Sequence, residues 1–325
     1  MQIKKIGAKI VRDSRREKTI QVFVKTAKGK FITSSPSGKS TGKYEVRPYF
    51  KSLTHDIDYI NNLDIIRINK IINETLGVDS SSINRNEKVT KNFSVNNSFL
   101  LLKKIELLIK NKLGGNSLFA LESSFLKALA KEKNLELFEF LSDKKIKEIT
   151  IKPVGNAVGG GLHSKGINGK KPEFQEFLFI PKEKTIKENI KTNEIAYELT
   201  KKLLKAKKIN DEGAWETGKI NEGVLNTMKE VQDILRNKYK KQAGIGIDIA
   251  SSSFYKKNYY YENLKRKLNS KKQIDYINRL ISDYDLFYVE DPLNEERIQM
   301  YKKLKDQFKD SCLICLNSKI NEYEK

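Results

Sequence analysis

The first part of the chain carries apolar residues at two different spacings. Three short segments alternate or cluster apolar positions as strands do, namely residues 3–11, 19–25 and 30–35. Lys28 and Gly29, between the last two, are typical of a hairpin turn. Three longer segments repeat apolar residues at helical intervals, namely residues 57–76, 99–112 and 118–132. Strands followed by helices predict a small α+β domain over residues 1–143, with Ser117 capping the third helix.

From residue 144 onward, short apolar runs alternate with amphipathic stretches. The runs typical of strands are residues 148–154, 174–181, 243–250, 286–290 and 312–316. The helical stretches are residues 193–205, 222–239, 274–282 and 294–308. Strands that alternate with helices predict parallel βα units, so we expect residues 144–325 to form an α/β domain of the barrel type. A closed barrel of this kind has eight strands, and the five found here predict an incomplete barrel.

The chain is long enough for two such domains and is strongly basic. It has 63 Lys and Arg against 41 Asp and Glu, a formal net charge of +22. A field of this sign attracts polyanions, but the lysines are scattered along every expected helix. The sequence contains neither a concentrated basic patch nor a nucleic-acid-binding module, so nucleic acid is not expected as a partner.

Apolar segments and cysteines indicate in which cellular compartment the protein is expected. The start, MQIKKIGAKI, lacks the apolar core of a signal peptide. The most apolar stretch, residues 98–109, is interrupted by Lys103 and Lys104 and is too short to cross a bilayer. Cys312 and Cys315 are spaced as C-x-x-C but fall in a run typical of a strand, which favours buried structural thiols over a redox or metal motif. We therefore expect a cytoplasmic protein without membrane segments.

Four acidic motifs stand at or beside apolar runs of the second domain. They are residues 174–177 (FQEF), 211–213 (DEG), 246–248 (GID) and 289–292 (VEDP). In a parallel barrel the active site lies at the C-terminal ends of the strands. Acids delivered there by neighbouring strands, such as Asp248 and Glu290, can share one hard cation such as Mg²⁺.

Two glycine-rich loops suggest nucleotide binding, but their spacing does not support it. Residues 36–42 contain Gly-Lys-Ser, yet Thr33 stands where a P-loop needs its first glycine. Residues 159–161 (GGG) do not match the dinucleotide fingerprint of a βαβ unit. The first loop, rich in small hydroxyls, is suited to fold over a ligand, with a plain turn as the alternative.

Seven motifs, in order along the chain, resemble those of the enolase (phosphopyruvate hydratase) family. They are residues 13–22 (DSRREKTIQV), 36–42 (PSGKSTG), 160–163 (GGLH), 175–177 (QEF), 211–213 (DEG), 246–252 (GIDIASS) and 289–292 (VEDP). In the first, Arg16, Glu17 and Lys18 replace the family's Gly-Asn-Pro. The resemblance implies a small α+β capping domain on a TIM-like, enolase-type α/β barrel.

The resemblance also implies a reaction, the Mg²⁺-dependent dehydration of 2-phospho-D-glycerate to phosphoenolpyruvate, with two Mg²⁺ stabilising the intermediate. Asp248 and Glu290 match ligands of the first metal, and Ser40 matches the loop residue that closes on the second. Asn317 stands where the family has its third metal acid. A neutral amide oxygen can still coordinate, but the site loses one negative charge and should hold Mg²⁺ less tightly.

The remaining matches concern the substrate. Glu212 matches the glutamate that assists departure of the hydroxyl group, and Glu176 lies beside it in the family's site. His163 and Gln175 match substrate contacts. Taken singly, these acids would be solvated surface groups and the histidine a satisfied loop residue.

The sequence departs from the family in its last part. The chain ends before the family's catalytic lysine, its phosphate-binding His-Arg-Ser segment and its final lysine, and neither Lys319 nor Lys325 matches them. Without that base, proton abstraction should be lost or nearly so.

Three interpretations remain open. The chain is the larger piece of a split enolase completed by a C-terminal polypeptide or by a homodimer, or a catalytically dead relative acting as a basic scaffold for anionic partners. In the third, an unrelated metal-dependent lyase reuses the site with another base. The asparagine at position 317 slightly favours loss of activity.

Overall fold

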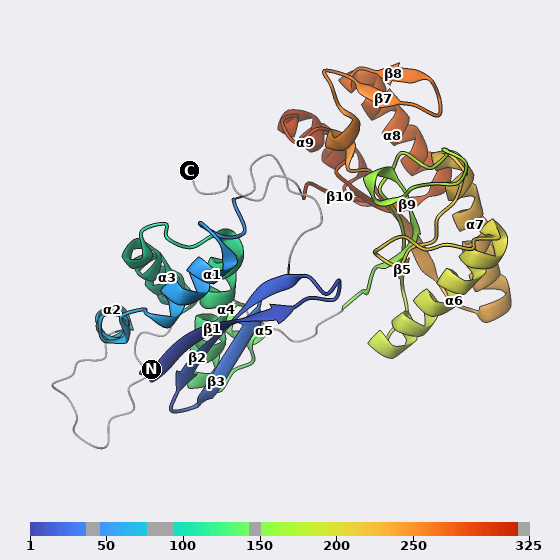
Figure 1. Ribbon diagram of the computed structural model, residues 1–325. Helices are drawn as coiled ribbons and strands as arrows, with labels where there is room; N and C mark the ends of the chain where they lie inside the picture. Colours follow the sequence, from blue (N-terminus) through green and yellow to red (C-terminus); the bar gives the residue numbers. More distant parts are fainter. Residues whose placement is uncertain (37–45, 77–93, 143–150, 318–325) are drawn as a thin grey trace. The chain divides into compact units, whose positions relative to one another are not determined.

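The computed structural model describes residues 1–36, 46–76, 94–142 and 151–317. Ser40 and its loop therefore lie outside the described residues. The chain divides into two compact units, Met1–Ile149 and Thr150–Lys325 (Figure 1).

The first unit contains a three-stranded antiparallel sheet in the order β1-β2-β3. Its strands are β1 (Lys5–Arg12), β2 (Lys18–Thr26) and β3 (Gly29–Ser34), close to the predicted segments. Alternate residues of the central strand, Ile20, Val22 and Val24, have no exposed surface. This period-two pattern is what places one face of the sheet against the helices.

Five helices complete the first unit: α1 (Leu53–Asn61), α2 (Ile65–Leu76), α3 (Val95–Ile109), α4 (Gly115–Glu132) and α5 (Leu137–Phe140). The prediction of a single helix over residues 57–76 is wrong, because α1 ends at Asn61 and a separate helix, α2, begins at Ile65. Asp64 starts α2 as its N-cap, and its Oδ1 accepts a hydrogen bond from Arg67 N at 3.0 Å. The predicted cap at Ser117 is also wrong, since α4 begins after Gly114 and Ser117 lies within its first turn.

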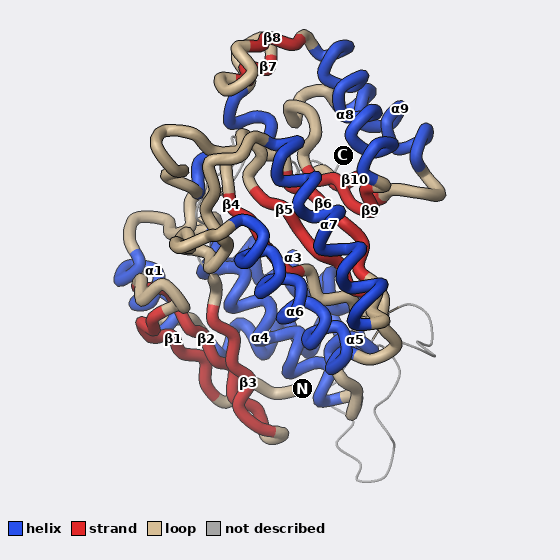
Figure 2. The backbone as a smooth tube through the Cα atoms, turned by 90° about the vertical axis from the view of Figure 1, so that its right-hand side faces the viewer, coloured by secondary structure: helices blue, strands red, loops and turns tan. Residues whose placement is uncertain are grey.

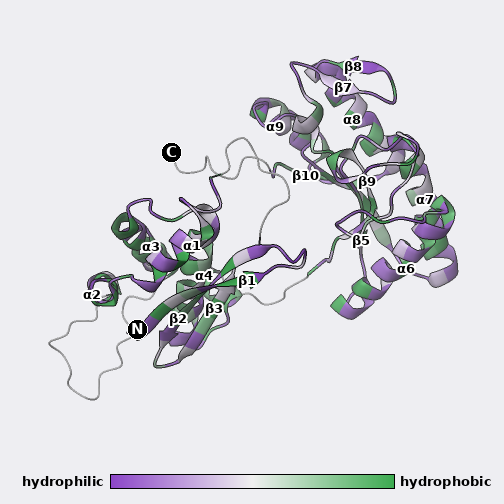
Figure 3. Ribbon diagram, in the orientation of Figure 1, coloured by the Kyte–Doolittle hydropathy of each residue, from purple (hydrophilic) through white to green (hydrophobic). Residues whose placement is uncertain are grey.

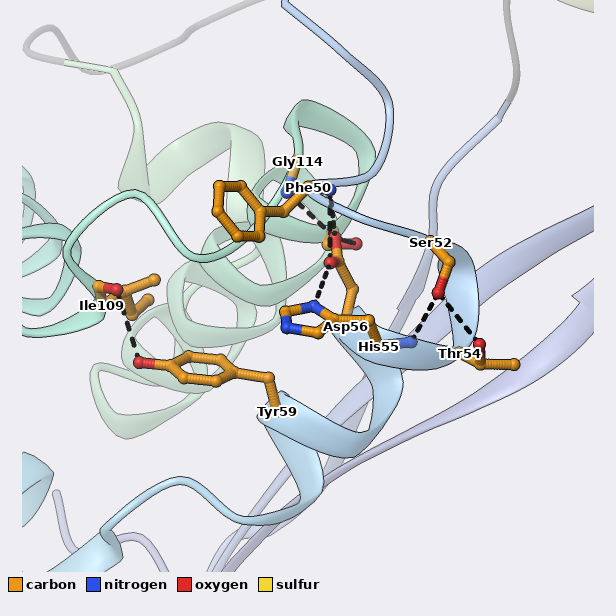
Figure 4. Close-up of polar contacts among 9 residues, drawn as sticks. Phe50, Ser52, Thr54, His55, Asp56, Tyr59, Ile109 and Gly114 are labelled. Atoms are coloured by element: carbon orange, nitrogen blue, oxygen red, sulfur yellow. Dashed lines mark hydrogen bonds and ion pairs between the residues drawn. The ribbon is translucent and has the colours of Figure 1, made fainter.

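A buried carboxylate on α1 contacts the N-terminal end of α4 (Figure 4). Asp56 on α1 is fully buried, and its Oδ2 accepts hydrogen bonds from Ser117 Oγ at 2.7 Å and Gly114 N at 2.9 Å. Its Oδ1 lies 3.2 Å from both Phe50 N and His55 Nδ1. The hydroxyl of Ser117 therefore serves as a donor to a neighbouring helix rather than as a cap.

The second unit is built on a five-stranded sheet in the order β10-β9-β6-β5-β4. The strands are β4 (Gly155–Gly159), β5 (Glu176–Pro181), β6 (Ala243–Asp248), β9 (Leu286–Glu290) and β10 (Leu313–Cys315). The expected number of strands is found, but the first is displaced. Residues 151–154 are not part of a strand, and Pro153 among them lacks the N–H that a sheet ladder requires.

The direction of the strands differs from the prediction of uniformly parallel βα units. β6, β9 and β10 are parallel, whereas β5 is antiparallel to both β4 and β6. Two helices, α6 (Ile186–Leu204) and α7 (Asn221–Tyr239), separate β5 from β6. A connection through one helix, such as the one from β6 to β9, returns the chain to the sheet as a parallel strand. A connection through two helices reverses the chain once more, so that β6 enters the sheet antiparallel to β5.

Helices cover one face of this sheet, as Figure 2 shows for α6 and α7. α6 contacts β4 and β5, α7 contacts β6, α8 (Ser270–Tyr284) contacts β9, and α9 (Ile298–Phe308) contacts β10. Hydrophobic and hydrophilic residues alternate along these helices (Figure 3), which identifies the sides that pack on the sheet. Phe177, Ile247 and Val289 from three neighbouring strands belong to the resulting core.

A hairpin of β7 (Tyr259–Tyr261) and β8 (Arg266–Leu268) is present that the sequence analysis missed. Tyr259 and Tyr261 of this hairpin are buried and belong to the hydrophobic core of the second unit, which therefore extends past the large sheet. Within the described residues the large sheet remains open, with β10 and β4 at its edges, in agreement with the expected incomplete barrel.

No helix among the described residues is long and apolar enough to span a membrane. Cys312 is buried and Cys315 half-buried, and both are free thiols next to or within β10, as predicted for structural cysteines.

Candidate active site

Three carboxylates lie side by side across one end of the large sheet. Glu176 is the first residue of β5, and Asp248 and Glu290 are the last residues of β6 and β9. Glu176 is paired in register with Asp248, which is paired with Glu290. Their chain neighbours in the core face the helices, so these three side chains lie on the opposite face of the sheet. The register thus brings together acids that lie up to 114 positions apart in the chain.

Asp248 is held firmly at the centre of this row. Its side chain is buried, with 7% of the residue exposed. Its Oδ1 accepts a hydrogen bond from Ala250 N at 2.9 Å, and its Oδ2 accepts one from Gln175 Nε2 at 3.0 Å. Burial, followed by the charges of Glu290 and Glu176, raises the pKa of Asp248 to about 8. Gln175, predicted as a substrate contact, is thus bound to a predicted metal ligand.

Glu290 and the end of β10 form the other side of the row. Tyr288 Oη donates a hydrogen bond to Glu290 Oε2 at 2.6 Å. The residue of β10 in register with Glu290 is Cys315. Asn317, the predicted third metal residue, lies exposed beyond the strand, where its backbone N donates to Asp291 Oδ1 at 2.8 Å. The contact that places Asn317 beside the row is therefore made by its backbone, to the residue that follows Glu290.

The other predicted residues gather around Glu176. The ligand atoms of His163, Glu176 and Glu212 all lie within 4.8 Å of one another. His163 Nδ1 lies 2.7 Å from Glu212 Oε2, although 49 positions separate them. Burial, followed by the charges of Glu212 and Glu290, raises the pKa of Glu176 to about 7. This carboxyl group is therefore able to hold a proton near neutral pH.

Glu212 is positioned by a compact turn. Asn210 Oδ1 accepts hydrogen bonds from Glu212 N at 3.0 Å and from Ala214 N at 2.9 Å. Gly213 in this turn has a φ of +83°, a conformation that side chains rarely adopt. The DEG motif thus needs its glycine for the turn and presents its glutamate to His163.

Contacts that sequence reasoning missed fix the loop that carries His163. Lys171 Nζ donates to the carbonyl oxygens of Gly161 and Ser164, the latter at 2.9 Å. The buried Glu216 accepts hydrogen bonds from Ser164 Oγ at 3.1 Å and Lys165 N at 3.0 Å. Lys171 is eight positions from His163 and Glu216 is four positions from Glu212, but nothing in their local pattern distinguishes them from surface charges.

The charge of the row is not balanced by basic side chains. Among the described residues, no Lys or Arg forms an ion pair with Glu176, Asp248 or Glu290. A buried acid between two half-buried acids of the same charge fits a divalent cation, which would supply the missing positive charge. The oxygen atoms of Asp248 and Glu290 are ligands of the type that Mg²⁺ prefers.

Sequence models of a known family match both units. The model described as "Enolase, N-terminal domain" matches residues 3–141, and the one described as "Enolase, C-terminal TIM barrel domain" matches residues 148–317.

Similar proteins bear the same name. The enolase of Methanosphaera stadtmanae is 31% identical over 317 residues, which cover 93% of this chain and 70% of that protein. The enolase of Pyrobaculum aerophilum is 33% identical over 211 residues, covering 62% of this chain and 49% of that protein. That of Methanothermobacter thermautotrophicus is 27% identical over 324 residues, covering 96% and 73%. These matches, together with the arrangement of the acids, show that the chain belongs to the enolase family.

Proposed function

We propose that this chain carries the metal and proton-donor half of an enolase-type lyase, which dehydrates 2-phospho-D-glycerate to phosphoenolpyruvate. The observation that supports this most strongly is the row of Glu176, Asp248 and Glu290, together with Glu212 and His163 at the same end of the sheet. The family membership and the fit of the row to a divalent cation support it further.

In this proposal the central acid of the row, Asp248, and its neighbour Glu290 hold the cation, for which Mg²⁺ is the candidate. Asp248 and Glu290 present carboxylate oxygens, and Gln175 keeps Asp248 in place through its 3.0 Å hydrogen bond. A cation held there would supply positive charge beside the substrate carboxylate.

Glu212 and Glu176 act on the leaving hydroxyl group. Loss of a hydroxyl group is assisted by an acid that gives it a proton. With a pKa of about 7, Glu176 can hold such a proton at neutral pH, and it lies next to Glu212. His163 orients Glu212 through their 2.7 Å contact and borders the space where a substrate would lie.

The base that removes the first proton has no counterpart among the matched motifs. We therefore propose that residues 1–325 bind the cation but do not complete the reaction alone. A segment outside residues 1–325, in the same polypeptide or in a second one, that pairs with the sheet edges at β4 and β10 and brings a lysine would supply the missing base.

The experiment has two arms, binding and turnover. Mg²⁺ binding to the chain is measured by calorimetry for the unaltered protein, for Asp248→Asn and for Asp275→Asn, a control at an exposed acid of α8. We expect binding to be lost only in Asp248→Asn. Equal binding by all three proteins would contradict the assignment of the site.

Turnover is measured as phosphoenolpyruvate formed from 2-phosphoglycerate in Mg²⁺, with and without an added polypeptide that carries the C-terminal strands and lysine of an enolase. We expect activity only in the mixture, and none when the mixture contains Glu212→Gln. A folded complement that binds the chain and restores no activity would refute the proposed reaction.

A further inference from the structure

We infer that Tyr288 is a positioning residue of the cation site and makes that site select Mg²⁺ over Ca²⁺. Tyr288 precedes Glu290 by two residues in β9, so both side chains stand on the same face of the sheet. The hydroxyl oxygen of Tyr288 lies 2.6 Å from Glu290 Oε2. The inference rests on the proposed function, because it concerns the cation assigned there to Asp248 and Glu290.

The hydroxyl group of Tyr288 is what holds the carboxylate of Glu290 in place. It is the donor in this contact, since an ionised carboxylate can only accept. Among the described residues no other hydrogen bond reaches the side chain of Glu290. Asp248, by contrast, is held through both of its oxygens, by Ala250 N and Gln175 Nε2. Because Glu290 has the longer and more flexible side chain, its orientation depends on the single bond from Tyr288.

Gly246 on the neighbouring strand β6 makes room for the tyrosine. It is paired in register with Tyr288. A Cβ atom at Gly246 would lie 3.1 Å from Tyr288 Cβ and 2.8 Å from Ile180 Cδ1, closer than side-chain atoms normally approach. The glycine therefore allows the half-buried Tyr288 to pack against the sheet directly below the row of acids.

The hydrogen bond makes the two oxygens of Glu290 unequal. Oε2 is engaged by the proton of Tyr288, whereas Oε1 has no hydrogen-bond partner within the described part of the chain. Oε1 is therefore the stronger ligand atom. A carboxylate whose orientation is fixed in this way offers a cation one oxygen rather than two.

The number of oxygens offered decides which ion is favoured. Mg²⁺ demands near-octahedral geometry with ligands at about 2.0–2.1 Å, keeps several waters and is bound through few carboxylates. Ca²⁺ accepts about six to eight oxygens in flexible geometry and often takes both oxygens of one carboxylate. A Glu290 that offers Oε1 alone thus suits Mg²⁺, and release of Oε2 would favour Ca²⁺.

The test is the binding of Mg²⁺ and of Ca²⁺ to the full chain, measured by calorimetry. Tyr288→Phe removes the hydroxyl group alone, and Tyr260→Phe is a matched control at an exposed tyrosine of β7. Asp248→Asn verifies that the ions bind at the proposed site. Unfolding in urea verifies that each variant is folded.

We expect Tyr288→Phe to weaken Mg²⁺ binding by about tenfold or more, as loss of a hydrogen bond to a metal ligand does, while Ca²⁺ binding is kept or strengthened. The preference for Mg²⁺ over Ca²⁺ should therefore fall by at least about tenfold, and change by less than about threefold in Tyr260→Phe. A purely structural role of the hydroxyl would weaken the binding of both ions equally and leave their ratio unchanged.

A second measurement needs only the unaltered protein. The carboxylate stretching bands of an infrared spectrum differ between binding through one oxygen and binding through two. The bands that appear on addition of Mg²⁺ should be of the one-oxygen type. Bands of the two-oxygen type with Mg²⁺ would contradict the inference.

An unchanged ratio of the two affinities in a folded Tyr288→Phe would overturn the inference and leave the cation site standing. Absent Mg²⁺ binding, or equal binding by the unaltered protein and Asp248→Asn, would refute the cation site itself and this inference with it. The Asp248→Asn variant thus distinguishes the two failures.

Discussion

Replacing Asp248 by asparagine should stabilise the metal-free protein at neutral pH while removing its affinity for Mg²⁺. The carboxyl of Asp248 is buried beside Glu290 and Glu176, and its pKa rises from 3.8 to about 8. A raised pKa means that the protonated acid is favoured in the folded state. The stability it contributes is fully present below pH 3.8 and is lost as the pH rises through about 8.

The size of the effect follows from these values. At pH 7 the unfolded chain ionises this acid freely, whereas the folded chain keeps it largely protonated. The pH lies about three units above the ordinary pKa, and each tenfold preference corresponds to about 1.4 kcal/mol, which gives about 4 kcal/mol in favour of unfolding. Asparagine does not ionise, so this cost is absent. Its amide nitrogen would, however, face the donor Gln175 Nε2 in place of an acceptor, and the lost hydrogen bond costs about 1 kcal/mol. We expect Asp248→Asn to raise the free energy of unfolding at pH 7 by a net amount of about 2–3 kcal/mol.

The assay is urea unfolding followed by the fluorescence of Trp215, the single tryptophan, which lies in the second unit. With a chelator present, the gain should be full at pH 7 and vanish near pH 4. With Mg²⁺ at about a hundred times its dissociation constant, the unaltered protein should regain about 2.7 kcal/mol and the variant nothing. Asp275→Asn should change neither curve. A variant less stable than the unaltered protein at pH 7, or a difference independent of pH, would refute the reasoning.

Two further predictions concern buried polar groups. Asp56→Asn should lower the free energy of unfolding by about 2–4 kcal/mol, because the buried carboxylate accepts hydrogen bonds from backbone N–H groups and a hydroxyl. As a control, Asp58→Asn, at an exposed position of the same helix, should change the free energy of unfolding by less than about 0.5 kcal/mol. Asn156→Leu should raise stability by about 1 kcal/mol, since neither polar side-chain atom finds a partner among the described residues and a cavity of about 250 Å³ adjoins it. Asn61→Leu should instead cost about 1–3 kcal/mol, because its amide bonds Ala8 N and O. Chemical denaturation measures all four; equal effects within either pair would contradict the role given to these hydrogen bonds.

The sequence by itself determined the elements that follow from local periodicity. The alternation of Ile20, Val22 and Val24 predicted a strand, and the strand does bury those residues. Four of the five strands of the second unit, the acids at their ends and the family motifs were likewise predicted, because hydrophobic spacing and short motifs are properties of neighbouring residues. Local pattern also misled, as at Asp64, where one apolar stripe continues across two helices separated by a cap.

Only the tertiary structure decided the direction of β5, the register of the acids and the contact of His163 with Glu212. A strand has the same periodicity in either direction, so the reversal of β5 depends on the path of α6 and α7 rather than on its own residues. The register that aligns Glu176 with Asp248 and Asp248 with Glu290 is set by packing across the sheet. Sequence motifs identified the acids, whereas the distances and burial that raise the pKa values of Glu176 and Asp248 arise only when distant segments meet.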